Sequence, residues 1–129
     1  MNVSRQRALT ELLDEAKRNG ITIHTDSEAE ELLDWAARRD GARPESYQAI
    51  TFGKDIFVRP RYANDVRVLR EEMIHVEQQQ AGIATDQIVK AEVQTRLLMI
   101  ENRHRWALSN DEVREMIDEV RLLRLRGRY

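Results

Sequence analysis

Helix-breaking residues are scarce in this sequence and lie between its amphipathic segments. The 129 residues include five glycines and two prolines. The segments between them repeat apolar residues three and four positions apart, which is typical of helices with one buried face. The expected helices cover residues 3–19, 27–39, 65–80 and 86–105 and a last segment that opens at residue 109. A chain with this pattern is expected to fold largely into packed helices.

Three short runs interrupt the helical pattern and favour β-strands. Residues 21–25 alternate β-branched side chains, and the runs Ala49–Phe52 and Asp55–Val58 are separated only by a Gly-Lys pair. Two such runs with a two-residue connection predict a β-hairpin. We therefore predict an α+β fold, with a small antiparallel sheet followed by a three-helix half, as a single domain over residues 1–129.

Composition and charge exclude several classes of protein. The chain has no cysteine, which removes disulfide frameworks, zinc ribbons and thiol nucleophiles. Its net charge of -2 disfavours a globally basic nucleic-acid binder. No apolar run approaches the roughly 20 residues that span a bilayer, and the first residues lack the apolar centre of a secretory signal. We expect a soluble protein, and both a cytoplasmic location and delivery within a larger secreted protein remain open.

The densest group of chemically active side chains is the run Glu71-Glu72-Met73-Ile74-His75. On the expected helix Glu71 and His75 are four residues apart and lie one turn above the other, while Glu72 lies one step round the helix. A carboxylate and an imidazole in this relation can bind one metal ion, and a neighbouring glutamate can take a proton from water. The alternative is a solvated Glu–His pair with no further role.

Glu92 lies on the next expected helix, which carries apolar residues on most sides. A carboxylate that is desolvated without a partner costs several kcal/mol, so Glu92 needs a cation. One candidate is a metal ion shared with Glu71 and His75. The other is the guanidinium of Arg96, one helical turn further along. The sequence leaves both partners open.

The order of elements around these residues resembles the core of zincin metallopeptidases. A strand at Asp55–Val58 precedes the run Leu-Arg-Glu-Glu-Met-Ile-His-Val-Glu-Gln, and Ala-Glu-Val-Gln follows after a glycine. The resemblance covers roughly residues 50–101. It is greatest to the small zincin-like toxin domains of bacterial polymorphic secreted proteins, in which this helix reads H-E-x-x-H and a glutamate on the following helix completes the site.

The resemblance implies a role for four residues. Glu71 stands where the first histidine would be, Glu72 takes the general-base position, His75 is the second ligand and Glu92 is the third. With Glu71 in place of a histidine, the ligand set is harder and more negative, which favours Mn²⁺ or Fe²⁺ relative to a histidine-rich set. Zn²⁺ is still the metal that we expect first.

The resemblance also implies a function, which is hydrolysis of a peptide or protein bond by a metal-dependent peptidase. The strand Asp55–Val58 would then lie along the cleft and pair with an extended substrate. In a bacterial toxin effector module, the expected partner besides the substrate is a dedicated immunity protein. The competing class is a catalytically inactive interaction module with the same fold.

Two further patterns suggest other classes. Residues 72–75 and 101–104 both read E-x-x-H, a motif that di-iron four-helix bundles use in pairs, and Glu92 and Glu15 could complete such a ferritin-like site. The short spacing between the two motifs and the strand-like runs argue against it. The basic residues of 121–129 could contact nucleic acid, but arginines are also favoured at a helix C-terminus by the helix dipole.

Overall fold

The computed structural model describes residues 2–82 and 87–127. The helices within these ranges are α1 (Val3–Arg18), α2 (Ser27–Arg39), α3 (Val66–Gln80), α4 (Ile88–Glu101) and α5 (Asn110–Gly127), the strands are β1 (Thr22–His24), β2 (Ala49–Phe52) and β3 (Asp55–Val58), and the 3₁₀ turns are η1 (Pro44–Ser46) and η2 (Pro60–Tyr62). The predicted α+β class is confirmed. The helix expected over 86–105 ends at Glu101, and its expected start at residue 86 lies outside the described residues. None of the described helices is long and apolar enough to cross a membrane.

The three strands form a mixed sheet in the order β1-β3-β2. The predicted hairpin is present, with β2 antiparallel to β3 and Gly53 in its turn at a φ of 60°. The prediction of an antiparallel sheet is wrong, because β1 pairs with β3 in the parallel direction. The pairing also makes Asp55–Val58 the central strand. Both of its edges are occupied, so it cannot pair with a substrate strand as the resemblance implied. Within the described ranges, the strands with a free edge are β1 and β2, and β2 is the one that lines the cleft beside α4.

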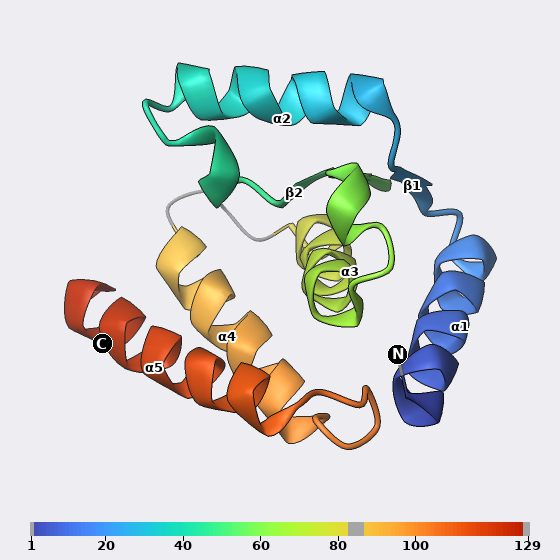
Figure 1. The fold of residues 1–129 in the computed structure, drawn as a ribbon. Coiled ribbons are helices and arrows are strands. Elements are labelled where there is room, and N and C mark those ends of the chain that lie inside the picture. Colours follow the sequence, from blue (N-terminus) through green and yellow to red (C-terminus); the bar gives the residue numbers. More distant parts are fainter. Residues whose placement is uncertain (1, 83–86, 128–129) are drawn as a thin grey trace.

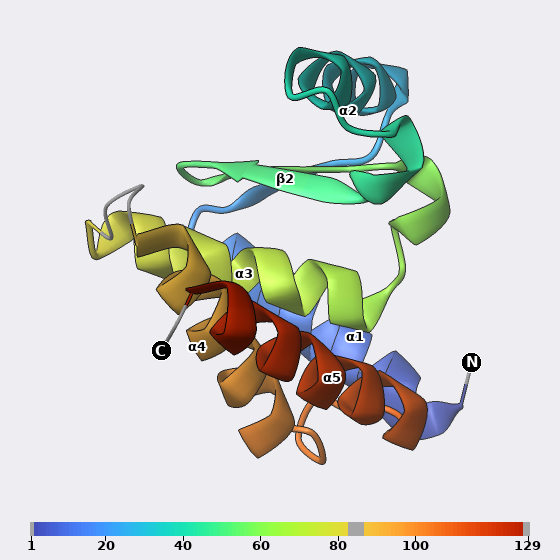
Figure 2. The ribbon, with the colours of Figure 1, turned by 90° about the vertical axis from the view of Figure 1, so that its left-hand side faces the viewer.

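The sheet lies between α2 on one face and α3 on the other (Figures 1 and 2). The main core joins α1, β3 and α3 and includes Leu12, Ile56, Val58 and Leu69, none of which is exposed. α3 is therefore covered by the sheet on one side and by α1 on another. The remaining side of α3 contacts α4, so α3 runs through the middle of the molecule.

Arg59, which follows β3, holds α2 and the segment before β2 in place. Its side chain is only 2% exposed, and Nη1 lies 2.7 Å from a carboxylate oxygen of Glu30 and 2.8 Å from one of Asp34, both on α2. Its other donors bond the carbonyl oxygens of Pro44 and Tyr47 at 2.8 and 2.7 Å. These bonds fix the segment that leads into β2, and they therefore help to position the free edge of β2.

α4 is less enclosed than its two apolar stripes predict. Met99 packs with Ile74 of α3 and Met116 of α5, but the side chains of Ile88 and Leu97 are largely exposed. The expectation of a helix buried on most sides is therefore wrong. α4 packs mainly against α5 and α3, and within the described part of the chain Ile88 and Leu97 remain exposed on its other face.

Candidate metal centre

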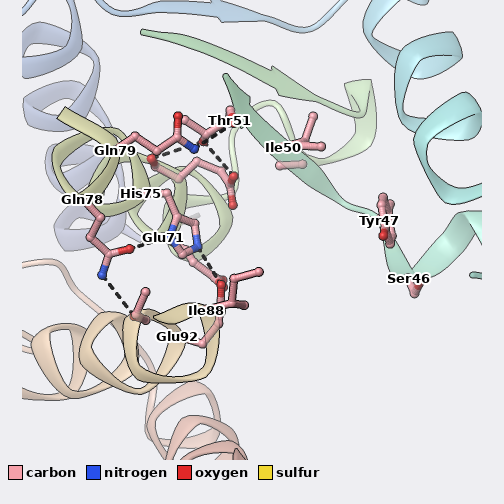
Figure 3. A pocket seen from close by; sticks show the side chains of 13 residues that line it. Ser46, Tyr47, Ile50, Thr51, Glu71, His75, Gln78, Gln79, Ile88 and Glu92 are labelled. Atoms are coloured by element: carbon pink, nitrogen blue, oxygen red, sulfur yellow. Dashed lines mark hydrogen bonds and ion pairs between the residues drawn. The ribbon is translucent and has the colours of Figure 1, made fainter. Parts of the chain in front are cut away.

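A cleft of about 720 Å³ opens between the free edge of β2 and α4 (Figure 3). Its sheet side is lined by Tyr47 and Thr51, and its α4 side by Ile88 and Glu92. The floor is formed by the run on α3 that the sequence singled out. The cleft thus brings the predicted residues of α3 and α4 to one solvent-accessible hollow.

Glu71, Glu72 and His75 converge at the floor of this cleft. Each of the three offers one potential ligand atom, and these atoms lie within 4.8 Å of one another. Asp65 caps the helix by accepting a 3.1 Å hydrogen bond from the backbone N–H of Val68, which sets the start of α3. β2 and α4 flank the cleft side of α3, so Glu72 is buried and Glu71 and His75 are partly buried. Glu71 and His75 are therefore not a freely solvated pair.

The orientation of the His75 ring is fixed by Gln78, one turn further along α3. The Nε2 amide of Gln78 is surrounded by acceptors at 3.0 Å on Ala91, Gln94 and Thr95, so its Oε1 atom has to face the histidine. Nδ1 of His75 lies 2.9 Å from that oxygen and therefore carries the proton that it donates. In the neutral ring Nε2 is then the nitrogen with a free lone pair, and a metal-binding histidine is commonly oriented in this way.

Glu92 contacts Arg96, one of the two partners that the sequence left open, and also His75, with which it would share a metal ion. Its Oε1 atom lies 3.3 Å from Nε2 of His75, and its Oε2 atom lies 2.6 Å from Nη1 of Arg96 (Figure 3). Two ligand atoms on one tetrahedral ion with bonds of about 2.0–2.1 Å lie about 3.3–3.4 Å apart. The His75–Glu92 pair therefore has the spacing of two ligands, although Glu92 lies outside the tighter group on α3.

Comparison with protein-family models and searches of curated proteins and of solved structures find no match.

Glu72 is the most buried carboxylate of the group, with 8% of its surface exposed. Burial raises its pKa to about 7, while His75 and a hydrogen bond from Thr51 oppose part of that rise. The hydroxyl of Thr51 donates this bond to Oε1 of Glu72 over 2.9 Å. A carboxyl group with a pKa near neutrality can both accept and release a proton at physiological pH, as a general base requires.

The pKa values of Glu71 and His75 are both raised, and both depend on burial and on the neighbouring charges. Burial raises the pKa of Glu71, and the nearby guanidinium of Arg96 offsets part of this. Burial opposes the charged form of His75, but Glu72 and Glu92 outweigh it and raise the pKa of the imidazole. The guanidinium of Arg67 also acts on Glu71. At His75, however, the three carboxylates outweigh burial, so a cation is favoured electrostatically at this position.

The other residues of the di-iron pattern do not join this group. Glu15 binds Arg70 through a 2.6 Å ion pair, and Glu101 and His104 are exposed. Among the described residues, the group of potential metal ligands consists of the three side chains on α3.

Sequence reasoning did not assign roles to Gln78, Thr51 or Gln79. Gln79 donates to the carbonyl oxygen of Thr51 at 3.0 Å and accepts from the N–H of Gly53 at 2.9 Å, which ties β2 to α3. Gln78 could have been found, because it lies three residues after His75 and therefore close to it on a helix. Thr51 is distant from Glu72 in sequence, and no local pattern indicated their contact.

Proposed function

We propose that this protein is a zincin-like, metal-dependent hydrolase that cleaves a peptide bond in the cleft between β2 and α4. The metal ligands in this proposal are Glu71, His75 and Glu92, and Glu72 is the general base. The observation that carries it is the orientation of His75, whose Nε2 atom faces the cleft beside carboxylate oxygens while Nδ1 is held by Gln78.

The donor set fits a divalent transition metal, with Zn²⁺ as the first candidate and Mn²⁺ or Fe²⁺ as alternatives. One imidazole nitrogen and two carboxylates form a set that all three metals accept in proteins. When bound, such a metal supplies Lewis-acid polarisation of the scissile carbonyl and promotes ionisation of water. The surplus of negative charge around His75 supports binding of a cation rather than of an anion.

Glu72 would move the proton during hydrolysis. It would accept a proton from the attacking water as the water oxygen bonds to the carbonyl carbon, and it would return this proton to the amine nitrogen as the C–N bond breaks. Its pKa of about 7 supports both halves of that transfer near neutral pH. Thr51 would keep the carboxyl group aimed into the cleft through its hydrogen bond.

The free edge of β2 supports a polypeptide as the substrate. The N–H of Arg59 donates to the carbonyl of Gln48, so Gln48 faces β3, and the alternation of an antiparallel ladder turns Ala49 and Thr51 toward the free edge. Gln79 already binds the carbonyl of Thr51. The two main-chain groups of Ala49 and the N–H of Thr51 have no partner among the described residues, and they can pair with an extended chain.

Metal analysis of the full-length protein tests this proposal. We expect one Zn²⁺, Mn²⁺ or Fe²⁺ per chain by elemental analysis and calorimetry, and hydrolysis of an unstructured protein substrate that a chelator abolishes. His75→Ala should lose both properties. The matched control is His104→Ala, which alters the exposed histidine of the second E-x-x-H pattern. A folded wild-type protein without affinity for any of the three metals would contradict the proposal.

The second candidate function is a non-catalytic interaction module, and Arg96 favours it. Its guanidinium already neutralises Glu92 at 2.6 Å and approaches Glu71 at 3.6 Å, so these carboxylates have a partner without any metal. If the domain is a toxin effector module, as its resemblance to such domains suggests, an immunity protein would cover the cleft in either case. Co-purification with a protein encoded beside it would test that setting.

A further inference from the structure

Arg96 lies among carboxylates from three different helices. Its Nη1 atom is 2.6 Å from Glu92 of α4, while Nη2 is 3.6 Å from Glu71 of α3 and 3.4 Å from Glu119 of α5. The Arg96 side chain is 13% exposed, and its Nε atom is buried without a hydrogen-bond partner. Nη1 also donates to the carbonyl oxygen of Glu92 at 3.1 Å. The guanidinium therefore makes two bonds to Glu92 and two longer contacts with other carboxylates, and Nε has no acceptor among the described residues.

A metal ion in the proposed site would compete directly with this guanidinium. Both cations would use the carboxylates of Glu71 and Glu92, and two positive charges a few ångströms apart repel each other beside partly buried groups. Arg96 therefore has to move away from these two carboxylates, or the metal binds weakly. Moving Arg96 costs little only if another anion lies within reach of its side chain, because the guanidinium needs a new charge partner.

Glu119 is such an anion, and its position is held from the other side. Arg67 of α3 binds Glu119 at 2.7 Å through one nitrogen and Glu115 at 2.8 Å through the other. α5 packs along α4 throughout this region (Figure 2). Glu119 thus faces Arg96 across the α4–α5 contact, and a small rotation of the guanidinium would give it a closer pair there.

We propose that Glu119 is a positioning residue of the metal site, which receives Arg96 when a cation displaces it from Glu71 and Glu92. This inference rests on the proposed function, because it assumes that the cleft binds a metal. Without metal, Arg96 supplies the positive charge that the carboxylates require. With metal, the Arg96–Glu119 pair removes the repulsion, so α5 contributes to metal affinity without touching the ion.

Calorimetric titration of the full-length protein with Zn²⁺ tests the role of Glu119. Glu119→Gln should weaken Zn²⁺ binding about tenfold, because the displaced guanidinium loses its acceptor charge. The matched control is Glu115→Gln, which removes a carboxylate one turn away that binds Arg67 but forms no ion pair with Arg96. This control should bind Zn²⁺ as the wild type does. Thermal melts verify that both variants are folded.

A double-mutant cycle separates positioning from a general loss of negative charge. Arg96→Gln should strengthen Zn²⁺ binding, since no guanidinium has to be displaced. Adding Glu119→Gln to that variant should then change the affinity by less than about twofold. In the wild type, Zn²⁺ should also shift the side-chain Nε–H resonance of Arg96, and this shift should be much smaller in Glu119→Gln.

The outcomes distinguish the two proposals. A wild-type protein that binds no metal overturns the proposed function and this inference together. If the wild type binds metal but Glu119→Gln and Glu115→Gln weaken binding equally, or if the effect of Glu119→Gln persists without Arg96, the metal site stands and the role of Glu119 is wrong.

Discussion

Nε2 of His75 on α3 lies 3.3 Å from Oε1 of Glu92 on α4, so residues of two successive helices share one edge of the cleft. The distance is that expected for two ligands of one ion, and it is also compatible with an ion pair when the imidazole is protonated. The contact between α3 and α4 is therefore part of the candidate site rather than only a support for it.

Gln78→Leu should reduce Zn²⁺ affinity by about tenfold or more, because His75 loses the acceptor that fixes its tautomer and ring orientation. Calorimetric titration measures the effect, and circular dichroism verifies the fold. Gln80→Leu is the control, since Gln80 is an exposed glutamine on the same helix. Unchanged affinity in folded Gln78→Leu would show that the ring is oriented by other contacts.

Glu72→Gln should stabilise the metal-free protein at pH 8 and have a much smaller effect at pH 5. The folded-state pKa of Glu72 is about 7, above its ordinary value of 4.5, so ionisation costs folding free energy as pH rises from about 4.5 to 7. Glutamine avoids this cost and still accepts the bond from Thr51. Thermal melts across this pH range measure the difference, and a stability gain that does not grow with pH would contradict the raised pKa.

The same substitution separates the two roles available to Glu72. As a general base, Glu72 is not a ligand, so Glu72→Gln should retain the metal and lose peptidase activity by about 100-fold or more. If Glu72 is instead a ligand within the group on α3, the Glu72→Gln variant should lose affinity for the metal. Elemental analysis and a peptidase assay on one preparation distinguish these outcomes.

Ala49→Pro should raise KM for a polypeptide substrate while metal affinity stays unchanged. Ala49 lies on the edge strand, and its N–H faces away from β3 in the observed register, so proline removes a donor to the substrate without breaking the ladder. The wild-type protein should show a similar rise in KM with substrates that are methylated at a backbone nitrogen. If neither change affects hydrolysis, the substrate does not pair with β2.

Arg59→Ala should destabilise the protein by about 2–4 kcal/mol, because it leaves Glu30 and Asp34 without their shared cation and two carbonyl groups without donors. Denaturant unfolding measures this free energy. Arg61→Ala is the control, since Arg61 is exposed and its nitrogen lies 3.7 Å from Glu30. It should change stability by less than about 0.5 kcal/mol.

Local patterns predicted the elements well because each depends on neighbouring residues. Asp65 caps α3 beside the apolar stripe that defines it, and the Gly-Lys pair forms the turn between β2 and β3. The pairing of β1 with β3 was not predictable in this way. The alternating pattern of residues 21–25 favours a strand but does not specify which neighbour it will join.

The sequence by itself determined that Glu71, Glu72 and His75 share one region of a helix, because 3.6 residues per turn place them there. Only the tertiary structure decided that Thr51 bonds Glu72, that Nε2 of His75 lies beside Glu92, and that Arg96 also contacts Glu71 and Glu119. The physical reason is that these contacts depend on how helices and strands pack against one another. That packing arises from apolar surfaces spread along the whole chain, and no short spacing of residues encodes it.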